Sequence, residues 1–344
     1  MTEPALSVQE PASAAVKRLA NGFCHAKLLL AADELGIFAD LHRHGPSTQA
    51  DLMDRLPLHP RGARELLYGL VLLGLLEFQD GSYTNSAAAA AALVPGAAEY
   101  IGGFLRRADR VLYPAWQNLA EALTSGKPQA PGAGPEAFRA MLSEPRQREQ
   151  YVKMMDSASG LVVGHLADAF DWGAHRHVAD IGGCSGNLVG HLLRRHTSLQ
   201  ATVFDLPELA GSFAEHSAAL GVADRVGFRA GDFFTDPLPE ADVVILGHVL
   251  HNWSADEREF LVAKAYGAVR PGGALLIYDA MLDDRPTNLA RVLVSLNMLL
   301  VTEEGSEYTM GEASAWLGAA GCHDVRVQAL GIADTLVAGY KPAV

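Results

Sequence analysis

The sequence predicts an α/β protein in which a helical N-terminal domain precedes a doubly wound, mostly parallel sheet. Three observations lead to this prediction. From His177 onward, apolar strand segments alternate with helical segments, as in a parallel sheet. A glycine-rich turn follows the first of these strands. Acidic residues stand at or just after the ends of three successive strands, at Asp180, Asp205 and Asp232.

The composition limits the partners and the compartment. With 344 residues and 49% hydrophobic content, the chain can build two domains with a sizeable core. A net charge of −13 disfavours a nucleic-acid partner and an anionic membrane. No apolar run reaches the ~18 residues of a membrane helix. The three cysteines, Cys24, Cys184 and Cys322, are too far apart for a disulfide or metal framework, which predicts a cytoplasmic location.

We expect residues 1–12 to be disordered and residues 13–105 to form the N-terminal domain. Its pattern is helical over 13–41, and two further helical segments precede a hairpin that turns at Asp80-Gly81. This order describes a winged helix, which suggests DNA binding. The second of those helices contains YGLVLLGLL, however, and such surplus apolar surface favours dimerisation. A winged-helix regulator that senses a small molecule remains a remote alternative.

Residues 106–172 are predicted to be a helical linker that contributes to a substrate pocket, and residues 173–344 the catalytic domain. In that domain we expect strands at 177–181, 201–205, 226–230, 242–247 and 274–279, and helices at 187–196, 207–220 and 255–269. The closing segments VRVQAL and DTLVAGYK are separated by only three residues and can pair as a hairpin.

The glycine-rich turn predicts a ligand site. Gly182, Gly183 and Gly186 let the backbone approach a ligand, and the helix that begins at Asn187 offers unpaired N–H groups. The glycine spacing does not match a nicotinamide fingerprint, and the P-loop lysine is missing. A pyrophosphate would also be repelled by Asp180, whereas a cationic ligand would not.

Two further acidic residues, Asp205 and Asp232, indicate which other chemical groups this ligand carries. Asp205 follows the turn by about 20 residues, the spacing of an acid that holds a ribose hydroxyl. Asp232 is followed by aromatic Phe233 and Phe234. Three acids and an aromatic face suit a ribose, an adenine and a positive charge, and S-adenosylmethionine carries all three.

Six stretches now support a resemblance: DIGGCSG, FDLPE, GDFFTDPLPEAD, ILGHVLHNW, VRPGGALLIYD and EGSEYTMGE. In this order, they resemble the S-adenosylmethionine-dependent O-methyltransferases of small aromatic molecules, of the plant caffeate and bacterial polyketide type. The resemblance implies a Rossmann-like class I methyltransferase sheet with an antiparallel last strand. It also implies a homodimer interlocked through the N-terminal domain. Cys184 and Asn252 depart from the family pattern, which usually has glycine and aspartate there.

The family's activity implies methyl transfer to a phenolic or enolic hydroxyl in specialised metabolism, such as antibiotic biosynthesis, with S-adenosyl-L-homocysteine as product. His251 matches the histidine that takes the acceptor proton, a task that suits its pKa near neutrality. Asp279 and Glu307 fall where the family places the residues that orient this base. His248 and His251 could suggest a metal, but no third ligand has suitable spacing, so we expect none.

The resemblance also implies the binding residues. The methionine end of the cofactor is expected at the glycine turn, the ribose at Asp205, and the adenine at Asp232 and Phe233. The full cofactor set is Asp180, Gly182, Gly183, Gly186, Asp205, Leu206, Gly231, Asp232, Phe233, Gly247 and His248. The acceptor candidates are Trp116, Tyr151, Met154, Met155, Asn252, Asn297 and Met298. C- or N-methylation, hydroxylation, decarboxylation or a pericyclic step on the same fold remain alternatives.

Overall fold

The computed structural model describes residues 11–97, 99–132 and 134–343. The chain divides into two compact units, Met1–Arg110 and Val111–Val344. The predicted linker, 106–172, therefore lies in both units. Of the segment predicted to be disordered, residues 1–10 lie outside the described residues.

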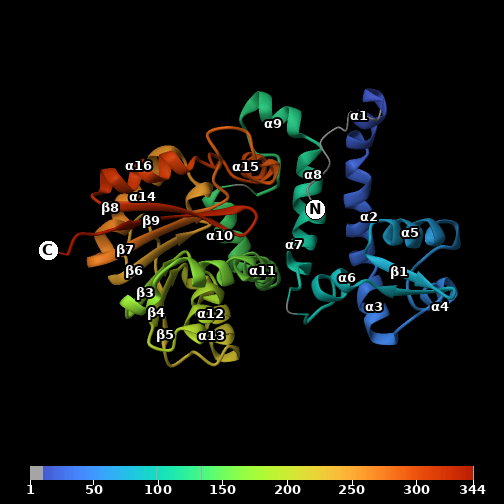
Figure 1. Cartoon of the computed structure of the whole chain (residues 1–344), viewed down its shortest axis with the longest axis horizontal. Coiled ribbons are helices and arrows are strands. Elements are labelled where there is room, and N and C mark those ends of the chain that lie inside the picture. The colour runs from blue at the N-terminus through green and yellow to red at the C-terminus, as the bar shows by residue number, and fades with distance from the viewer. Residues whose placement is uncertain (1–10, 98, 133, 344) are drawn as a thin grey trace. The chain divides into compact units, whose positions relative to one another are not determined.

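The smaller unit consists of helices and one antiparallel hairpin (Figure 1). The single helical stretch predicted for 13–41 is three helices, because the chain takes the left-handed conformation at Gly36 and breaks at Asn21. The hairpin turns at Asp80 and Gly81 as predicted, both with positive φ. Its elements are α1 (Ala12–Ala20), α2 (Gly22–Glu34), α3 (Ile37–His44), α4 (Gln49–Arg55), α5 (Pro60–Leu72), β1 (Leu76–Gln79), β2 (Ser82–Asn85), α6 (Ala87–Ala92) and α7 (Gly102–Arg107).

The larger unit is built on a seven-stranded sheet of order β5-β4-β3-β6-β7-β9-β8 (Figure 1). The first five of these strands are parallel, while β9 is antiparallel to β7 and to β8, which confirms the predicted hairpin and mixed sheet. The strands are β3 (His177–Ile181), β4 (Gln200–Asp205), β5 (Val226–Ala230), β6 (Ala241–Gly247), β7 (Val269–Asp279), β8 (His323–Leu330) and β9 (Asp334–Tyr340).

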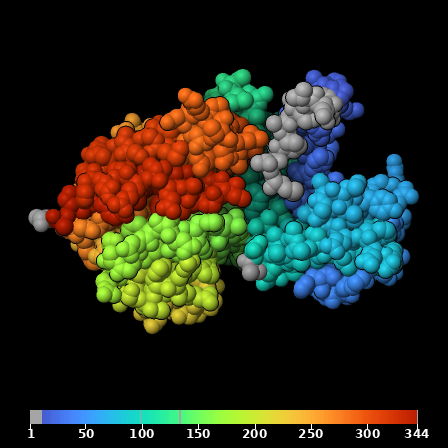
Figure 2. Space-filling model, viewed as in Figure 1, coloured from blue at the N-terminus to red at the C-terminus, as the bar shows by residue number. Residues whose placement is uncertain are grey.

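Helices cover both faces of this sheet. One face packs against α11 (Pro145–Ala169), α12 (Asn187–Arg195) and α13 (Ala210–Ala219), and the other against α14 (Ala255–Ala268) and α16 (Met310–Ala320). The remaining elements are η1 (Ala108–Leu112), α8 (Tyr113–Trp116), α9 (Leu119–Ser125), α10 (Pro135–Ser143), η2 (Trp172–Ala174), η3 (Pro207–Leu209), η4 (Leu250–Asn252) and α15 (Leu289–Val301). In Figure 2, the surface of this unit is divided between β3 to α13, in green to yellow, and the later segments, in orange to red.

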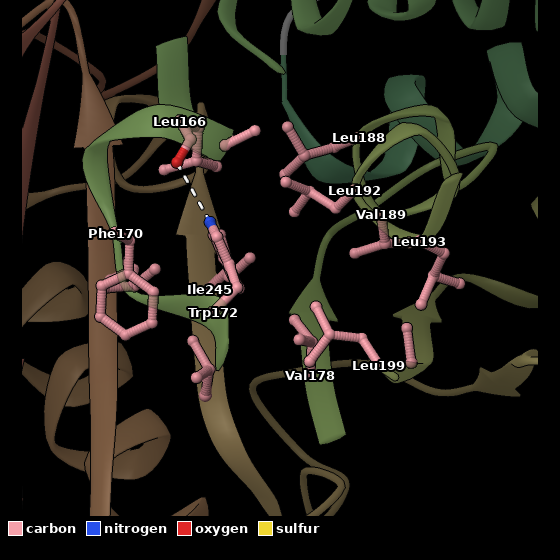
Figure 3. Close-up of a cluster of buried hydrophobic side chains, with 14 of the residues drawn as sticks. Leu166, Phe170, Trp172, Val178, Leu188, Val189, Leu192, Leu193, Leu199 and Ile245 are labelled. Carbon is pink, nitrogen blue, oxygen red and sulfur yellow. Dashed lines mark hydrogen bonds between the residues drawn. The ribbon is translucent and has the colours of Figure 1, made fainter. Parts of the chain in front are cut away.

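A core on the α11–α12 face anchors the start of the sheet (Figure 3). Trp172 is almost fully buried, and its Nε1 donates a hydrogen bond to the backbone oxygen of Leu166 at 3.3 Å. Val178 of β3 packs there with Leu188 and Leu192 of α12. Because this packing holds α12 against the sheet, the turn that joins β3 to α12 stands at the carboxyl edge of the parallel strands.

Candidate active site

The glycine turn is tied to the acid that ends the next strand. The backbone N–H of Cys184 donates to Asp205 Oδ2 at 2.8 Å, and that of Leu206 donates to Asp205 Oδ1 at 2.7 Å. Cys184 itself adopts the left-handed conformation, with φ 53°, where the family usually has glycine. The carboxylate of Asp205 is therefore held in one orientation at the edge of the sheet.

At Gly182 and Gly183 the backbone of this turn is packed too closely to carry side chains. A Cβ on Gly183 would lie 2.5 Å from Asp180 Oδ2, and one on Gly182 would lie 2.8 Å from Val249 Cγ2. Asp180 is buried, and its Oδ2 has no hydrogen-bond partner within the described part of the chain. Burial raises the pKa of Asp180 to about 7 and that of Asp205 to about 6. The desolvated carboxyl groups of Asp180 and Asp205 therefore favour a ligand that is cationic or donates hydrogen bonds.

A pocket opens at this turn. Five of its lining residues are among the predicted cofactor residues: Asp180, Gly182, Gly183, Gly247 and His248. The rest of its lining is Met155, Asp156, Ser159, Cys184, Ser185, Asn187, Leu188 and Tyr278. The lining does not include the other predicted cofactor residues, Gly186, Asp205, Leu206, Gly231, Asp232 and Phe233.

A polar network from α11 lines the pocket and was missed by the sequence reasoning. Ser185 Oγ donates to the carboxylate of Asp156, and Asn187 Nδ2 donates to Asp156 O at 3.1 Å and to Ser159 Oγ at 2.7 Å. Asn187 begins a helix directly after the turn, so its position was a usable signal. Asp156 and Ser159 carried none, because they lie on a long helix about 30 residues away in sequence.

The predicted cofactor residues Gly231, Asp232 and Phe233 follow the end of β5 and do not line this pocket. Asp232 Oδ2 accepts a hydrogen bond from Arg139 Nη2 at 2.5 Å, and Asp232 Oδ1 accepts one from the N–H of Phe234 at 2.9 Å. Phe233 Cε1 would lie 4.0 Å from a Cβ on Gly182, so this ring faces the glycine turn. Gly231 has Phe204 in close contact, which leaves no room for a side chain there.

The structure brings His251, Asp279 and Glu307 together from three separate elements. His251 lies in the short helix η4 after β6, Asp279 ends β7, and Glu307 lies in the loop before α16. His251 Nδ1 is 2.8 Å from Glu307 Oε1 and 3.0 Å from Asp279 Oδ1. Both carboxylates are fully buried, and Tyr308 donates its hydroxyl to Asp279 Oδ2 at 2.6 Å. Nδ1 thus hydrogen-bonds to Glu307 with the Asp279 carboxylate beside it, and Nε2 is the ring nitrogen left for a substrate.

The electrostatics of this cluster make His251 a stronger base than free histidine. Burial alone lowers its pKa, but the charges of Asp279 and Glu307 outweigh burial and raise the pKa to about 9. Burial also raises the pKa of Asp279, to about 6. A phenol has a pKa of about 10, so a base in this range is well matched to its hydroxyl.

His248 lies beside this cluster. Its ring is parallel to that of His251 with centroids 5.8 Å apart, and its Nε2 is 3.0 Å from Asp334 Oδ1. The metal ligands considered from the sequence were His248 and His251. The structure instead places ligand atoms of His251, Asp279 and Glu307 within 4.8 Å of one another.

The acceptor candidates fall into separate groups within the larger unit. Trp116 Nε1 donates to Asn297 Oδ1 at 2.8 Å, which joins α8 to α15, and Met298 is buried next to that contact. Tyr151 and Met155 pack instead in a cluster with Cys184. Met154 is also buried on α11.

Asn252 has a structural contact of its own. Its side-chain amide donates to the backbone oxygens of His248 and Val249, both at 3.2 Å.

The order of this sheet, with its antiparallel penultimate strand and its glycine turn flanked by acids, defines a class I methyltransferase fold. The orphaned oxygen of Asp180 and the tightly packed glycines fit a cofactor with an ammonium, a sulfonium and a ribose. In the described residues we find no helix with the length and apolar character needed to cross a membrane.

Comparison with known proteins agrees. The model of the O-methyltransferase domain matches residues 116–323, and that of the O-methyltransferase dimerisation domain matches residues 17–95. The chain belongs to the O-methyltransferase family and is an S-adenosylmethionine-dependent methyltransferase.

Three relatives illustrate the match. The chain is 44% identical to the tetracenomycin polyketide synthesis 8-O-methyl transferase TcmO of Streptomyces glaucescens, over 95% of this chain and 96% of that protein. It is 38% identical to the N,N-dimethyltransferase OxyT of Streptomyces rimosus, over 94% and 95%. The structure of human N-acetylserotonin methyltransferase in complex with SAM superposes with a TM-score of 0.89 at 30% identity, covering 98% of this chain and 100% of that one.

Proposed function

We propose that this enzyme methylates a hydroxyl group of a small aromatic molecule of polyketide type, and that His251 is the general base. The observation that carries the proposal is the pair of buried carboxylates on His251 Nδ1, at 2.8 and 3.0 Å. The name of TcmO, a methyl transferase of polyketide synthesis, supports a polyketide acceptor and a role in specialised metabolism.

The bound cofactor supplies an electrophilic methyl group on a sulfonium. The protein's own task is to remove the proton of the acceptor hydroxyl as that oxygen attacks. His251 Nε2 accepts this proton, while Glu307 accepts the hydrogen bond from Nδ1–H, and the charges of Glu307 and Asp279 stabilise the imidazolium that forms. The protein also accelerates the reaction by positioning the acceptor, because the attacking oxygen must be in line with the methyl group and its leaving sulfur.

The cofactor assignment follows the contacts at the sheet edge. Asp180 and Asp156 would receive the ammonium at the glycine turn, and Asp205 the ribose hydroxyls. Phe233 would cover the adenine, and Asp232, after releasing Arg139, would accept a hydrogen bond from the adenine amino group. We assign the other predicted glycines, with Leu206 and His248, to the walls of this site.

We assign acceptor binding to the two groups of side chains found in the larger unit. Trp116, Asn297 and Met298 form one wall and Tyr151, Met154 and Met155 another, because flat aromatic acceptors suit adaptable methionine and aromatic surfaces. Asn252 we assign to the support of the base. We assign dimerisation to residues 13–105, the role of a linker to residues 106–172 and catalysis to residues 173–344.

We further propose a homodimer through the N-terminal unit, which the dimerisation domain supports. That unit exposes large apolar side chains that a partner subunit would cover. They are Val16, Leu19, Phe23, Tyr68, Leu72 and Phe78.

The test uses methyl-deuterated S-adenosylmethionine and a panel of hydroxylated naphthoates, anthraquinones and matched amines, analysed by mass spectrometry. We expect the label on a hydroxyl of a fused aromatic ring, and a loss of about 100-fold or more in His251→Gln. Label on the amines alone would overturn O-methylation. Full turnover in His251→Gln would overturn the role of the base.

A further inference from the structure

Arg258 connects the two segments that carry the base and its acid partner. It lies on α14 and is buried, with 5% of its surface exposed. Its Nε donates to the backbone oxygen of Leu250 at 3.0 Å, next to His251. Its Nη2 donates to Ser306 O at 2.6 Å and Ser306 Oγ at 2.9 Å, next to Glu307. One guanidinium thus bridges both sides of the His251–Glu307 contact.

The bridged segments also pack directly on each other. A Cβ on Gly305 would lie 2.5 Å from the backbone oxygen of His251 and 3.0 Å from the backbone carbon of Asn252. Thr302 Oγ1 accepts from the N–H of Gly305 at 2.9 Å, which shapes this loop. Since the loop and η4 are in van der Waals contact, their spacing depends on the groups that bond them together.

Arg258 also completes a charge balance. Asp279 and Glu307 place two carboxylates in a fully buried position, and buried charges require compensation. Protonated His251 compensates one of them. The guanidinium lies 5.2 Å from the ring centroid of Tyr308, whose hydroxyl donates to Asp279. An arginine keeps its charge when buried, so it can compensate the second carboxylate in every state of His251.

The other charged or titratable groups around the cluster are identified by their contacts. His248 stacks on His251 from the same loop, and Asp334 of β9 pairs with His248. Tyr278 of β7 packs against His248, and Glu312 of α16 interacts electrostatically with Arg258. Asp334 adds to the negative potential at His251.

We propose that Arg258 is a positioning residue for methyl transfer, which fixes His251 against Glu307 and supplies the second positive charge of the cluster. It touches neither substrate nor cofactor in this assignment. The inference rests on the proposed role of His251 as the base. Arg258 opposes protonation of His251, so its removal should raise the pKa of His251 and leave less of the free base at neutral pH.

The experiment measures the pKa and the Nδ1–H signal of His251 rather than turnover. The full-length protein is labelled with ¹³C-histidine, saturated with S-adenosyl-L-homocysteine, and titrated by NMR, with His251→Gln used to assign the signal. We expect Arg258→Met to raise the pKa of His251 by about one unit. Arg258→Lys should leave that pKa near the wild-type value, since the charge stays, but weaken the low-field Nδ1–H signal, since the bridge to Leu250 and Ser306 is lost.

Arg225→Met is the matched control. Arg225 also joins backbone oxygens, those of Leu193 at 2.9 Å and Thr197 at 3.3 Å, but belongs to the other end of the sheet. It should leave the His251 titration unchanged. An unmoved pKa in Arg258→Met overturns the charge role, and an unchanged Nδ1–H signal in Arg258→Lys overturns the bridging role.

Two further outcomes separate the possibilities. If Arg258→Met does not fold, Arg258→Gln replaces it in the titration, and Arg258→Lys by itself decides the bridge. If His251→Gln retains turnover of the aromatic panel, the proposed base is wrong, whatever the titration shows. If His251→Gln loses turnover as expected but the Arg258 variants leave the pKa and the Nδ1–H signal of His251 unchanged, only the proposed role of Arg258 is wrong.

Discussion

Asn252 holds the turn that carries the base: its side-chain amide donates to the backbone oxygens of His248 and Val249. The family usually has aspartate here, and a carboxylate cannot donate to a carbonyl oxygen. In this chain the amide therefore ties the end of η4 to the two residues that precede this helix, and it does so at the position directly after His251.

The first prediction concerns this amide contact. In Asn252→Asp the carboxylate would face two carbonyl oxygens, which costs about 1–3 kcal/mol and should lower kcat roughly tenfold or more. Steady-state kinetics and thermal unfolding measure both effects. Asn118→Asp is the control, because Asn118 is exposed at the N-cap of α9 and its side chain makes no cap hydrogen bond, so aspartate is tolerated there. Unchanged turnover in Asn252→Asp would show that the amide is dispensable.

The second prediction concerns pH. The pKa of His251 is raised to about 9 by Asp279 and Glu307 against burial, and only the neutral ring can accept a proton. The rate should therefore rise with pH toward that value. Glu307→Gln removes one carboxylate, so the rising limb should move to lower pH, and the plateau should fall because the base is weaker. A limb that stays in place contradicts this role. Glu304→Gln, an exposed residue of the same loop, should not move it.

His251 also links pH to stability. Its folded-state pKa lies above the ordinary value of 6.5, so its contribution is complete below 6.5 and is lost as pH rises through about 9. Chemical unfolding at pH 6.5 and 9.5 should show a larger loss of stability in the wild type than in His251→Gln. Equal losses in both proteins would place the pH dependence elsewhere.

The third prediction concerns cofactor binding. Burial raises the pKa of Asp180 to about 7 and that of Asp205 to about 6, and a cationic ligand favours their ionised forms. Binding of S-adenosylmethionine should therefore release protons and tighten as pH rises from 5.5 to 7.5. Calorimetry in buffers of different ionisation enthalpy counts those protons. Asp180→Asn should remove the upper step, and a pH-independent affinity would refute the assignment.

The fourth prediction concerns the glycine turn. A methyl group at Gly183 would lie 2.5 Å from Asp180 Oδ2, so Gly183→Ala should displace that carboxylate and weaken cofactor binding by tenfold or more. Gly211→Ala is the matched control, because nothing lies within 4 Å of a Cβ there and α13 accepts alanine well. Equal affinities for the two variants would argue against close approach at Gly183.

The fifth prediction concerns metals. We expect the activity to survive chelation, because the acids of the His251 cluster hold a proton on Nδ1 in our proposal. EDTA followed by gel filtration should leave kcat unchanged. Loss of activity that a divalent cation restores would instead assign His251, Asp279 and Glu307 as ligands, since their atoms lie within 4.8 Å of one another.

The sheet and its edge were predictable from local sequence. Apolar runs such as HVADI and ADVVILG determine strands by themselves, and the glycine turn after β3 determines where the chain reverses. The hairpin at Asp80-Gly81 was equally local, since both positions need a positive φ. Helix 13–41 was predicted as one piece, because a break at Asn21 leaves little trace in an apolar pattern.

The α/β fold, the acid-flanked glycine turn and the residue types available for a base therefore follow from the order of residues along the chain. Which of these residues come into contact depends on how the elements pack in three dimensions. His251, Asp279 and Glu307 are 28 or more residues apart, yet His251 Nδ1 lies 3.0 Å from Asp279 Oδ1 and 2.8 Å from Glu307 Oε1. The contacts of Asp156 with Ser185 and of Arg258 with Ser306 had no sequence signature, because side-chain contacts between distant elements depend on packing rather than on spacing.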